Sequence, residues 1–225
     1  MDAAKLNSLL SQFPAREIVD QTGEPVGLIV TTPCRLQFPH LDKAHKAPNS
    51  QRATYSACLL IPPSADLSPL RAFAKRYALT VKASNLRNPI RDGAEKVGKI
   101  DGLEAGWHFV NVASNEINPK TGEVMAPPAL VNPDLTRADA SAFYAGCWVV
   151  AKLSAYTYNT NGNAGVSFGL RSLQFIAHDT VLRTGADPSD GFTAIKGVIA
   201  NARADVAASG MTPANAAAPA ELPGW

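Results

Sequence analysis

The chain begins with a short amphipathic pattern that is followed by turn residues. Leu6, Leu9 and Leu10 fall on one side of a helix, and Pro14 ends this pattern because proline cannot continue a helix. The residues DQTGEP at 20–25 predict a turn, since glycine and proline interrupt regular structure there. We therefore expect residues 1–25 to form an N-terminal extension that contains one short helix.

Period-two alternation of apolar and polar residues predicts the main strands. Pro33 lies inside the first of these segments and indicates an edge strand or a bulge. In the last segment the apolar phase changes after Leu170, which predicts a bulge near 171–172. The turn-forming runs NPKTG and NTNGN separate strand patterns. The expected strands are 26–38, 53–61, 107–114, 147–158 and 164–177.

One helix is expected between the second and third strands. Leu70, Phe73 and Tyr77 form an apolar stripe, and Pro69 fits the first turn, where no N–H group is needed. Residues 80–106 then show no regular pattern, and a segment of that length is usually functional or disordered. This order predicts a mainly β fold, a five-stranded antiparallel barrel of the OB (oligonucleotide/oligosaccharide-binding) type with a long basic loop.

The same pattern divides the chain into three parts. We expect an extension at 1–25, an OB-type domain at 26–178 and a C-terminal tail at 179–225. The tail is rich in alanine and proline, so we expect it to be flexible and partly disordered.

The strand at 147–158 carries aromatic residues on the side that should face water. Trp148, Lys152, Tyr156 and Tyr158 share one side, whereas the other side is apolar. Because an unpaired lysine is rarely buried, Lys152 favours exposure of the aromatic side. Exposed rings can stack on the bases of single-stranded nucleic acid. The alternative is that a helix or loop covers this side, which would make the aromatic residues part of a core.

Charge is local in this chain. The formal net charge is only +2, so affinity for nucleic acid must come from particular surfaces. Residues 71–99 contain eight basic and two acidic residues. For Arg91, an internal ion pair with Asp92 is the alternative to a phosphate contact. The residues expected to contact phosphates are Lys82, Arg87, Arg91, Lys99, Lys152 and Arg171, and Trp107 and Phe109 are further candidates for stacking.

Catalysis, metal binding and cofactor binding are not expected. The three cysteines have no C-x-x-C spacing, which predicts reduced and buried thiols. There is no P-loop and no H-E-x-x-H motif. Cys147 and His108 could be imagined as a nucleophile and its base, but Cys147 lies on the apolar side of its strand. Because these motifs are absent, we expect a protein that is not an enzyme. The sequence shows no signal peptide and no membrane span, so we expect the protein to be cytoplasmic.

Four runs carry a resemblance to a known family over residues 53–177. They are TYSACLLIPP, NPIRDGAEK, AGWHFVNVAS and SAFYAGCWVVAKLSAYTYNTNGNAGVSFGLRSLQ. In this order and spacing they resemble the bacteriophage single-stranded DNA-binding proteins of the OB-fold type. The resemblance implies a protein that coats single strands without sequence preference during phage replication or recombination. Arg171 departs from the family pattern, which has asparagine there.

The resemblance also implies partners. Single-stranded DNA is the expected ligand, and replication proteins are expected to bind through the C-terminal tail, although this tail is not acidic and ends in Trp225. The oligomeric state stays open. One alternative is an OB-fold module that binds a protein of a replisome or virion and no DNA. A second is a nuclease, for which the sequence shows no carboxylate cluster.

Overall fold

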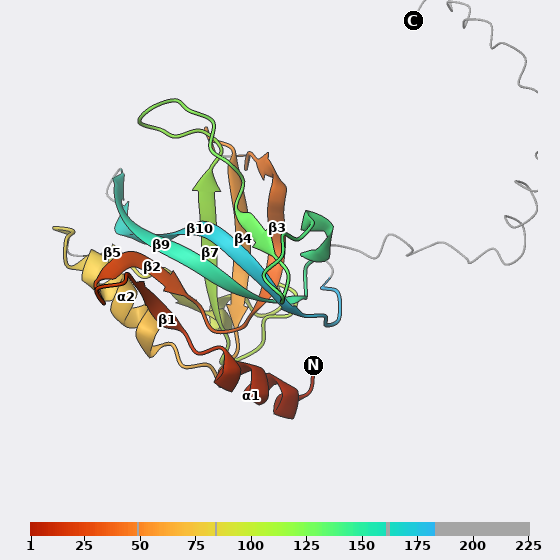
Figure 1. The fold of residues 1–225 in the computed structure, drawn as a ribbon. Helices are drawn as coiled ribbons and strands as arrows, with labels where there is room; N and C mark the ends of the chain where they lie inside the picture. The colour runs from red at the N-terminus through yellow and green to blue at the C-terminus, as the bar shows by residue number, and fades with distance from the viewer. Residues whose placement is uncertain (49, 84, 161–162, 183–225) are drawn as a thin grey trace, which may run out of the picture. The chain divides into compact units, whose positions relative to one another are not determined.

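The structure is a computed structural model that describes residues 1–48, 50–83, 85–160 and 163–182 (Figure 1). The expected flexibility and partners of the tail concern residues that lie almost wholly outside this part of the chain. The N-terminal helix α1 (Ala3–Gln12) confirms the helix predicted there, and the Asp2 carboxylate caps it by accepting a hydrogen bond from the Lys5 N–H at 2.8 Å. No helix of the described residues has the length and apolar character that crossing a membrane requires.

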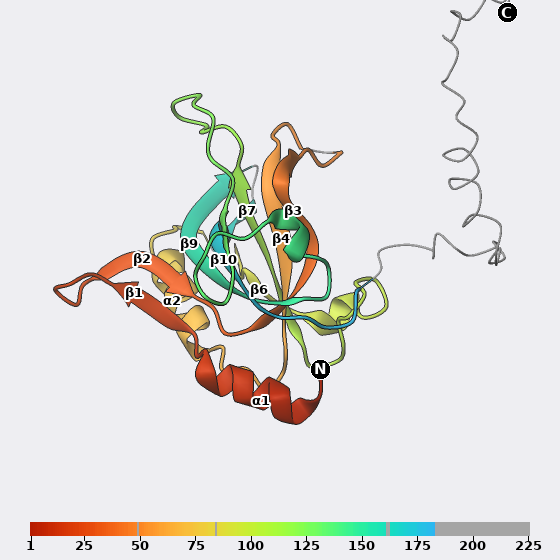
Figure 2. The same ribbon diagram turned by 45° about the vertical axis from the view of Figure 1, so that its right-hand side comes forward.

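Five strands pair in a closed circuit. β3 (Cys34–His45) pairs with β4 (Thr54–Ile61), which pairs with β7 (His108–Asn115). β7 pairs with β10 (Asn163–Ala177), β10 with β9 (Trp148–Thr160), and β9 again with β3 (Figures 1 and 2). The strands expected at 53–61, 107–114, 147–158 and 164–177 are thus confirmed. The register of β9 and β10 shifts between Leu170 and Ser172, which confirms the predicted bulge.

The prediction of a five-stranded antiparallel barrel is nevertheless wrong in two respects. The sheet contains ten strands in the described residues, and β10 runs parallel to three of its partners. The first expected strand divides near Pro33, and its earlier part pairs with a strand that the sequence did not predict. The additional strands are β1 (Arg16–Val19), β2 (Pro25–Val30), β5 (Leu86–Arg87), β6 (Ile90–Asp92) and β8 (Ala129–Val131). Four of these have two to four residues, which is too short to show a period of two.

Helix α2 (Ser68–Ala78) confirms the helix predicted between the second and third main strands. Leu70, Phe73 and Ala74 are buried, and the Phe73 ring lies 6.3 Å from that of Phe168 on β10. Arg76 on α2 forms an ion pair with Glu17 on β1. The helix therefore packs on the sheet through its apolar stripe. Its ion pair with Glu17 also links it to the hairpin that β1 and β2 form.

Two apolar clusters hold the fold together. The larger one lies between α2 and the inward-facing residues of the circuit, including Phe73 and Phe168. The second, which we call the outer cluster, lies on the outer face of β4, β7 and β9, and α1 packs against it through Leu6. Its buried members are Cys58, Leu60, Leu103, Trp107, Phe109, Trp148 and Leu182. Part of the outer face is therefore core rather than surface.

Candidate nucleic-acid interface

The outer face of β9 has a covered end and an open end. Trp148 is only 2% exposed, whereas Tyr156 is 46% exposed. Lys152, between them, is exposed, and Tyr158 is half-buried. Alternation along the strand correctly predicted which residues share this face. It did not predict where the face becomes accessible to solvent.

Three residues expected to stack on bases are buried, so that expectation is wrong for them. Trp148 and Trp107 pack against each other in the outer cluster with ring centroids 6.3 Å apart. Phe109 is buried in the same cluster, beneath the guanidinium of Arg91, whose central carbon lies 5.3 Å from the ring centroid. The cover comes from Leu103 and Leu182, which are distant from Trp148 in sequence.

Asp179 fixes the covered end by hydrogen bonds. It accepts one from Trp148 Nε1 at 2.7 Å and another from the N-terminal ammonium of Met1, also at 2.7 Å. Partial burial alone would raise the pKa of Asp179. The hydrogen bonds from the ammonium, Trp148 and Thr180, together with the charge of Arg35, outweigh burial and lower this pKa to about 2. Asp179 is therefore a carboxylate at neutral pH and holds the two ends of the described chain together.

Beyond the covered end, the outer face is hollowed across β7, β10 and β9. One hollow of about 510 Å³ is lined by Ala113, Gly169 and Tyr156. A second hollow of about 560 Å³ is lined by Asn111, Ser167 and Tyr158. On each of the same three strands, these residues lie two positions from the residue that lines the first hollow. The two hollows therefore lie side by side, and we call them together the outer groove.

Small residues of β10 form the floor of the outer groove. A Cβ added at Gly169 would lie 2.6 Å from Ser154 Oγ, and one added at Gly165 would lie 2.7 Å from the Arg87 carbonyl oxygen. The neighbour at position 165 is backbone and cannot move aside, so this position requires glycine, whereas a side chain at 169 would only have to displace the Ser154 hydroxyl. The tyrosines of β9 stand beside this low floor, since Tyr156 is paired with Ser167 and Tyr158 with Gly165.

The first hollow is bounded by the segment 116–128 between β7 and β8, which we call the arm, so we call it the arm hollow. Arg52 and Arg171 line it, and none of the described Asp or Glu residues does. The Arg171 guanidinium donates from Nε to Ser154 Oγ at 3.1 Å, which places it at the groove. The arm hollow thus offers positive charge with no carboxylate among its lining residues.

The second hollow, which we call the loop hollow, is lined by charges of both signs. Arg87 and Arg91 face it together with Asp92 and Glu95. Arg87 donates from Nη2 to Asn163 Oδ1 at 2.8 Å. The internal ion pair of Arg91 with Asp92, the alternative to a phosphate contact, is not found among the described side chains, and Asp92 instead accepts from the Ala94 N–H at 2.9 Å.

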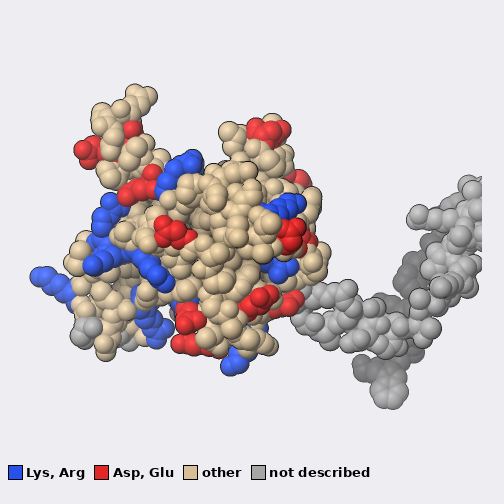
Figure 3. All heavy atoms as spheres, turned by 90° about the horizontal axis from the view of Figure 1, so that it is seen from below, with Lys and Arg blue, Asp and Glu red and all other residues tan. Residues whose placement is uncertain are grey.

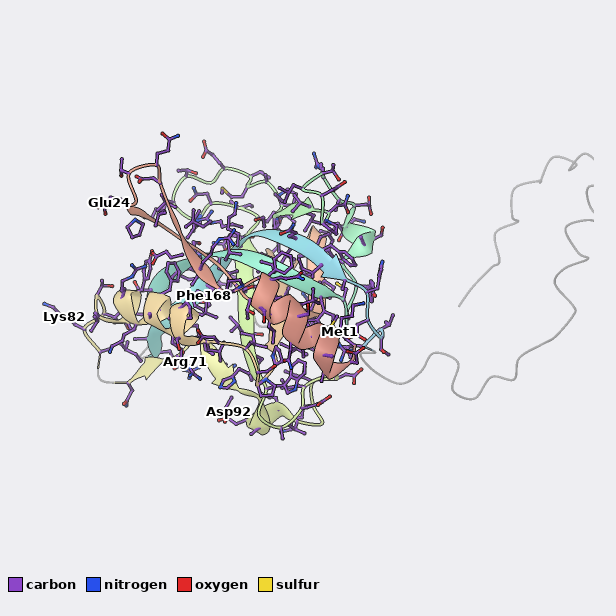
Figure 4. All side chains as sticks on the ribbon, turned by 60° about the horizontal axis from the view of Figure 1, so that its bottom comes forward. Met1, Glu24, Arg71, Lys82, Asp92 and Phe168 are labelled. Carbon is purple, nitrogen blue, oxygen red and sulfur yellow. The ribbon has the colours of Figure 1, made fainter. Side chains whose placement is uncertain are left out.

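The remaining lysines that were expected to contact phosphates line neither hollow. Lys82 follows α2 and points away from the protein (Figure 4). Lys99 is exposed in the turns after β6, and Lys152 is exposed on β9. Figure 3 shows Lys and Arg side chains gathered on the side that holds α2 and β5. The structure therefore brings together Tyr156, Tyr158, Arg87, Arg91 and Arg171 and leaves Lys82, Lys99 and Lys152 outside the groove.

The sequence matches a known family over most of its length. The profile described as "Enterobacter phage Enc34, ssDNA-binding protein" matches residues 28–202. The chain belongs to this family. The resemblance to phage single-stranded DNA-binding proteins is thereby confirmed. The matched residues begin near the expected start of the OB-type domain at 26 and extend past the expected end of that domain at 178. No sequence among curated proteins matches the chain.

Solved structures of the Enc34 protein share the fold. The single-stranded DNA-binding protein from bacteriophage Enc34 in complex with ssDNA superimposes with a TM-score of 0.58 and 17% identity, covering 76% of this chain and 98% of that chain. Its C-terminal truncation gives 0.54 and 16%, covering 74% and 97%. A third structure of that protein gives 0.51 and 17%, covering 80% and 97%. At these identities the likeness concerns the fold.

Within this family fold, the described residues offer little for catalysis. Burial raises the pKa of the Cys147 thiol to about 12, so Cys147 is not a nucleophile near neutral pH. Residues 165–169 read GVSFG and match the G-x-S-x-G spacing of hydrolase nucleophiles. Ser167, however, lies within the extended strand β10 and not on the strand-to-helix turn that such a nucleophile needs. No group of three or more His, Cys, Asp or Glu in the described chain could hold a metal ion.

Sequence reasoning missed several residues of the arm hollow. Arg52 precedes β4 in a polar connection, and Asn115, Pro119 and Met125 belong to the end of β7 and the arm. None of them lies in a pattern that predicts a binding site. The resemblance described from the sequence gave no signal for them either, because none of its four runs contains these residues.

Proposed function

We propose that this protein binds single-stranded DNA without sequence preference along the outer groove, and that it does so in phage DNA replication or recombination. Membership of the Enc34 family supports the choice of ligand, and the solved relative with the highest of the three TM-scores is described as being in complex with ssDNA. The closed pairing of β3, β4, β7, β10 and β9 supports an OB-type barrel to which further strands have been added. The cytoplasm of the host cell is the compartment that such a role requires.

The arm hollow is the observation that carries the proposal. It combines an exposed tyrosine, Tyr156, with Arg52 and Arg171 and with no lining carboxylate. Aromatic rings stack on bases with little regard to sequence, because every base has a flat face, and each stacked base contributes about 1–3 kcal/mol. Tyr156 is the strongest candidate for stacking, and the half-buried Tyr158 is the second.

The basic residues differ in how well they are placed to contact phosphates. Arg52 and Arg171 are the main candidates because, within the described part of the chain, no carboxylate lines their hollow. Arg87 and Arg91 are weaker candidates, since Asp92 and Glu95 line the same hollow and oppose an anion there. The exposed lysines Lys82, Lys99 and Lys152 can contact phosphates only where the strand leaves the groove.

Preference for single strands follows from stacking. In a duplex, neighbouring bases cover the flat faces of one another, so a ring at the groove finds no free face to stack on. An unpaired strand exposes those faces and is flexible enough to follow the groove. The proposal therefore requires that duplex DNA of the same length and composition binds much more weakly.

The test is a titration of fluorescein-labelled oligo-dT followed by anisotropy, at low and high salt, with duplex DNA as the competitor. We expect tight binding that weakens as salt rises and that duplex DNA competes for poorly. Trp107 and Trp148, the two tryptophans among the described residues, are both buried, so anisotropy is preferred to tryptophan fluorescence. Equal affinity for duplex would contradict the stacking groove, and absence of binding would favour the protein-interaction module. Recruitment of replication proteins by the tail stays a proposal about residues outside the described chain.

A further inference from the structure

The arm is a hairpin that holds its own shape. The Met125 N–H donates to the Glu116 carbonyl oxygen at 2.7 Å, and the Asn118 N–H donates to the Glu123 carbonyl oxygen at 2.8 Å. Ile117 and Val124 form a β-bridge between these bonds. Figures 1 and 2 show the arm standing out from the end of the sheet after β7. The arm is therefore an ordered projection, and the hydrogen bond to Glu116 at its base fixes the backbone of Met125.

Two neighbouring apolar residues of the arm differ in where they face. Val124 is 80% exposed and does not line the arm hollow, whereas Met125 is 37% exposed and lines it. Pro119 and Pro127 line the same wall. Because proline has a rigid ring and methionine adapts its shape, this wall suits a flat apolar ligand.

The other residues that line the arm hollow suit a ligand with a flat ring and an anionic group, because they include an aromatic ring, small residues and two arginines. Tyr156 stands among the strand residues that line it, and the floor consists of the small residues Ala113 and Gly169. A hollow of about 510 Å³ lies within the range of about 300–1,000 Å³ that is usual for small-molecule sites. The amide of Asn115, which has no hydrogen-bond partner among the described residues, supplies a polar group for the edge of the ligand.

We infer that the arm hollow is a nucleobase site, an inference that rests on the proposed function. One base of the bound strand leaves the stack of its neighbours and inserts between Met125 and Tyr156. The phosphates on either side of that base then face Arg52 and Arg171. The arm holds this single base in place. The neighbouring nucleotides of the strand lie along the loop hollow, whose lining charges balance.

The experiment uses the shortest labelled oligo-dT that still binds with full affinity, because a short strand limits the number of registers. A set of such oligonucleotides lacks one base each, at successive positions, while the phosphate backbone stays intact. Anisotropy titrations of the full chain should show one position at which loss of the base weakens binding by about 5-fold or more, as expected for one stacked base. Loss at other positions should cost less.

Variants then assign that position to the arm. Met125→Ala should weaken binding of the intact oligonucleotide by about 5-fold, and removal of the critical base should cost this variant little more. Val124→Ala is the matched control, since it removes an equally apolar neighbour that faces away from the hollow. It should bind like the wild type and keep the sensitivity to the missing base. Thermal melting by circular dichroism checks that both variants are folded.

The outcomes separate this inference from the proposed function. Binding of the intact strand with equal losses at every missing base would overturn the nucleobase site and leave the proposed function standing. Equal effects of Met125→Ala and Val124→Ala would also overturn it, because the arm would then act only as a scaffold. No binding of the intact strand by the wild type would overturn both.

Discussion

The two ends of the outer face of β9 have the same alternation but different surroundings. At one end Trp148 is buried, packs on Trp107 and donates a hydrogen bond to Asp179. At the other end Tyr156 is exposed beside a floor that consists of Ala113 and Gly169. A period of two determines which side chains share a face, but not whether a segment that is distant in sequence covers that face. An aromatic side chain is therefore part of the core at one end and a candidate ligand contact at the other.

The sharpest test of this comparison is the stability of the covered end. Trp148→Ala should lower the free energy of unfolding by about 3–5 kcal/mol, because it removes a large buried side chain and leaves a cavity. Tyr156→Ala on the same strand should change it by only about 0.5 kcal/mol, as expected at an exposed site. Urea denaturation followed by circular dichroism measures both. Similar losses for the two variants would mean that Tyr156 also belongs to the core.

A second test removes the charge that fixes the covered end. Asp179→Asn should lower the free energy of unfolding by about 1.5–3 kcal/mol at neutral pH, since hydrogen bonds to charged groups contribute about this much. The pKa of Asp179 in the folded protein is about 2, below the ordinary value of 3.8. The contribution of Asp179 is therefore fully present above about pH 4 and is lost as the pH falls toward 2.

Unfolding curves measured across this pH range supply the control for Asp179. The stability difference between wild type and Asp179→Asn should be constant near neutral pH and should narrow below about pH 4. A difference that stays constant down to pH 2 would show that the variant acts by some means other than charge. DNA affinity should be unaffected at neutral pH, because Asp179 lies at the covered end.

The open end is tested by affinity instead of stability. Tyr156→Ala should weaken binding of oligo-dT by about 1–3 kcal/mol, or about 5- to 150-fold, if its ring stacks on one base. Tyr156→Phe keeps the ring and should bind within about 2-fold of the wild type. Anisotropy titrations compare the three proteins. Equal losses for alanine and phenylalanine would assign the effect to the hydroxyl and contradict stacking.

Much of the fold follows from the sequence, for a physical reason. β4, β7, β9, β10 and α2 are long and each buries an apolar face over many residues, so these elements can be predicted from the sequence. The short strands bury too few residues to show a period. The cover over Trp148 comes from residues near 100–107, from Leu182 and from α1, and a local pattern carries no information about such distant contacts.

The candidate site was predictable only where it lies on long strands. Tyr156 and Tyr158 share the outer face of β9, as the alternation predicted, and Arg171 lies on the neighbouring strand β10. Arg52 and Met125 come from irregular segments, and only the folded chain brings them to the same hollow. A segment as long as 80–106 is usually functional or disordered. Its later part instead supplies Leu103 to the outer cluster, so this part has a structural role.

The smallest expected effect separates the two hollows of the groove. For a single strand, each phosphate contact by a cation contributes about 0.7 to the slope of log affinity against log salt concentration. Arg171→Gln should therefore reduce this slope by about 0.7, since the arm hollow has no carboxylate among its described lining residues. Arg91→Gln should reduce it by less, because Asp92 and Glu95 line the same hollow as Arg91. Lys5→Gln, on the exposed face of α1, is the control and should leave the slope unchanged. Titrations at four or more salt concentrations measure the three slopes. Equal reductions for Arg171 and Arg91 would mean that the carboxylates of the loop hollow do not offset its arginines, and that the strand contacts both hollows through its phosphates alike.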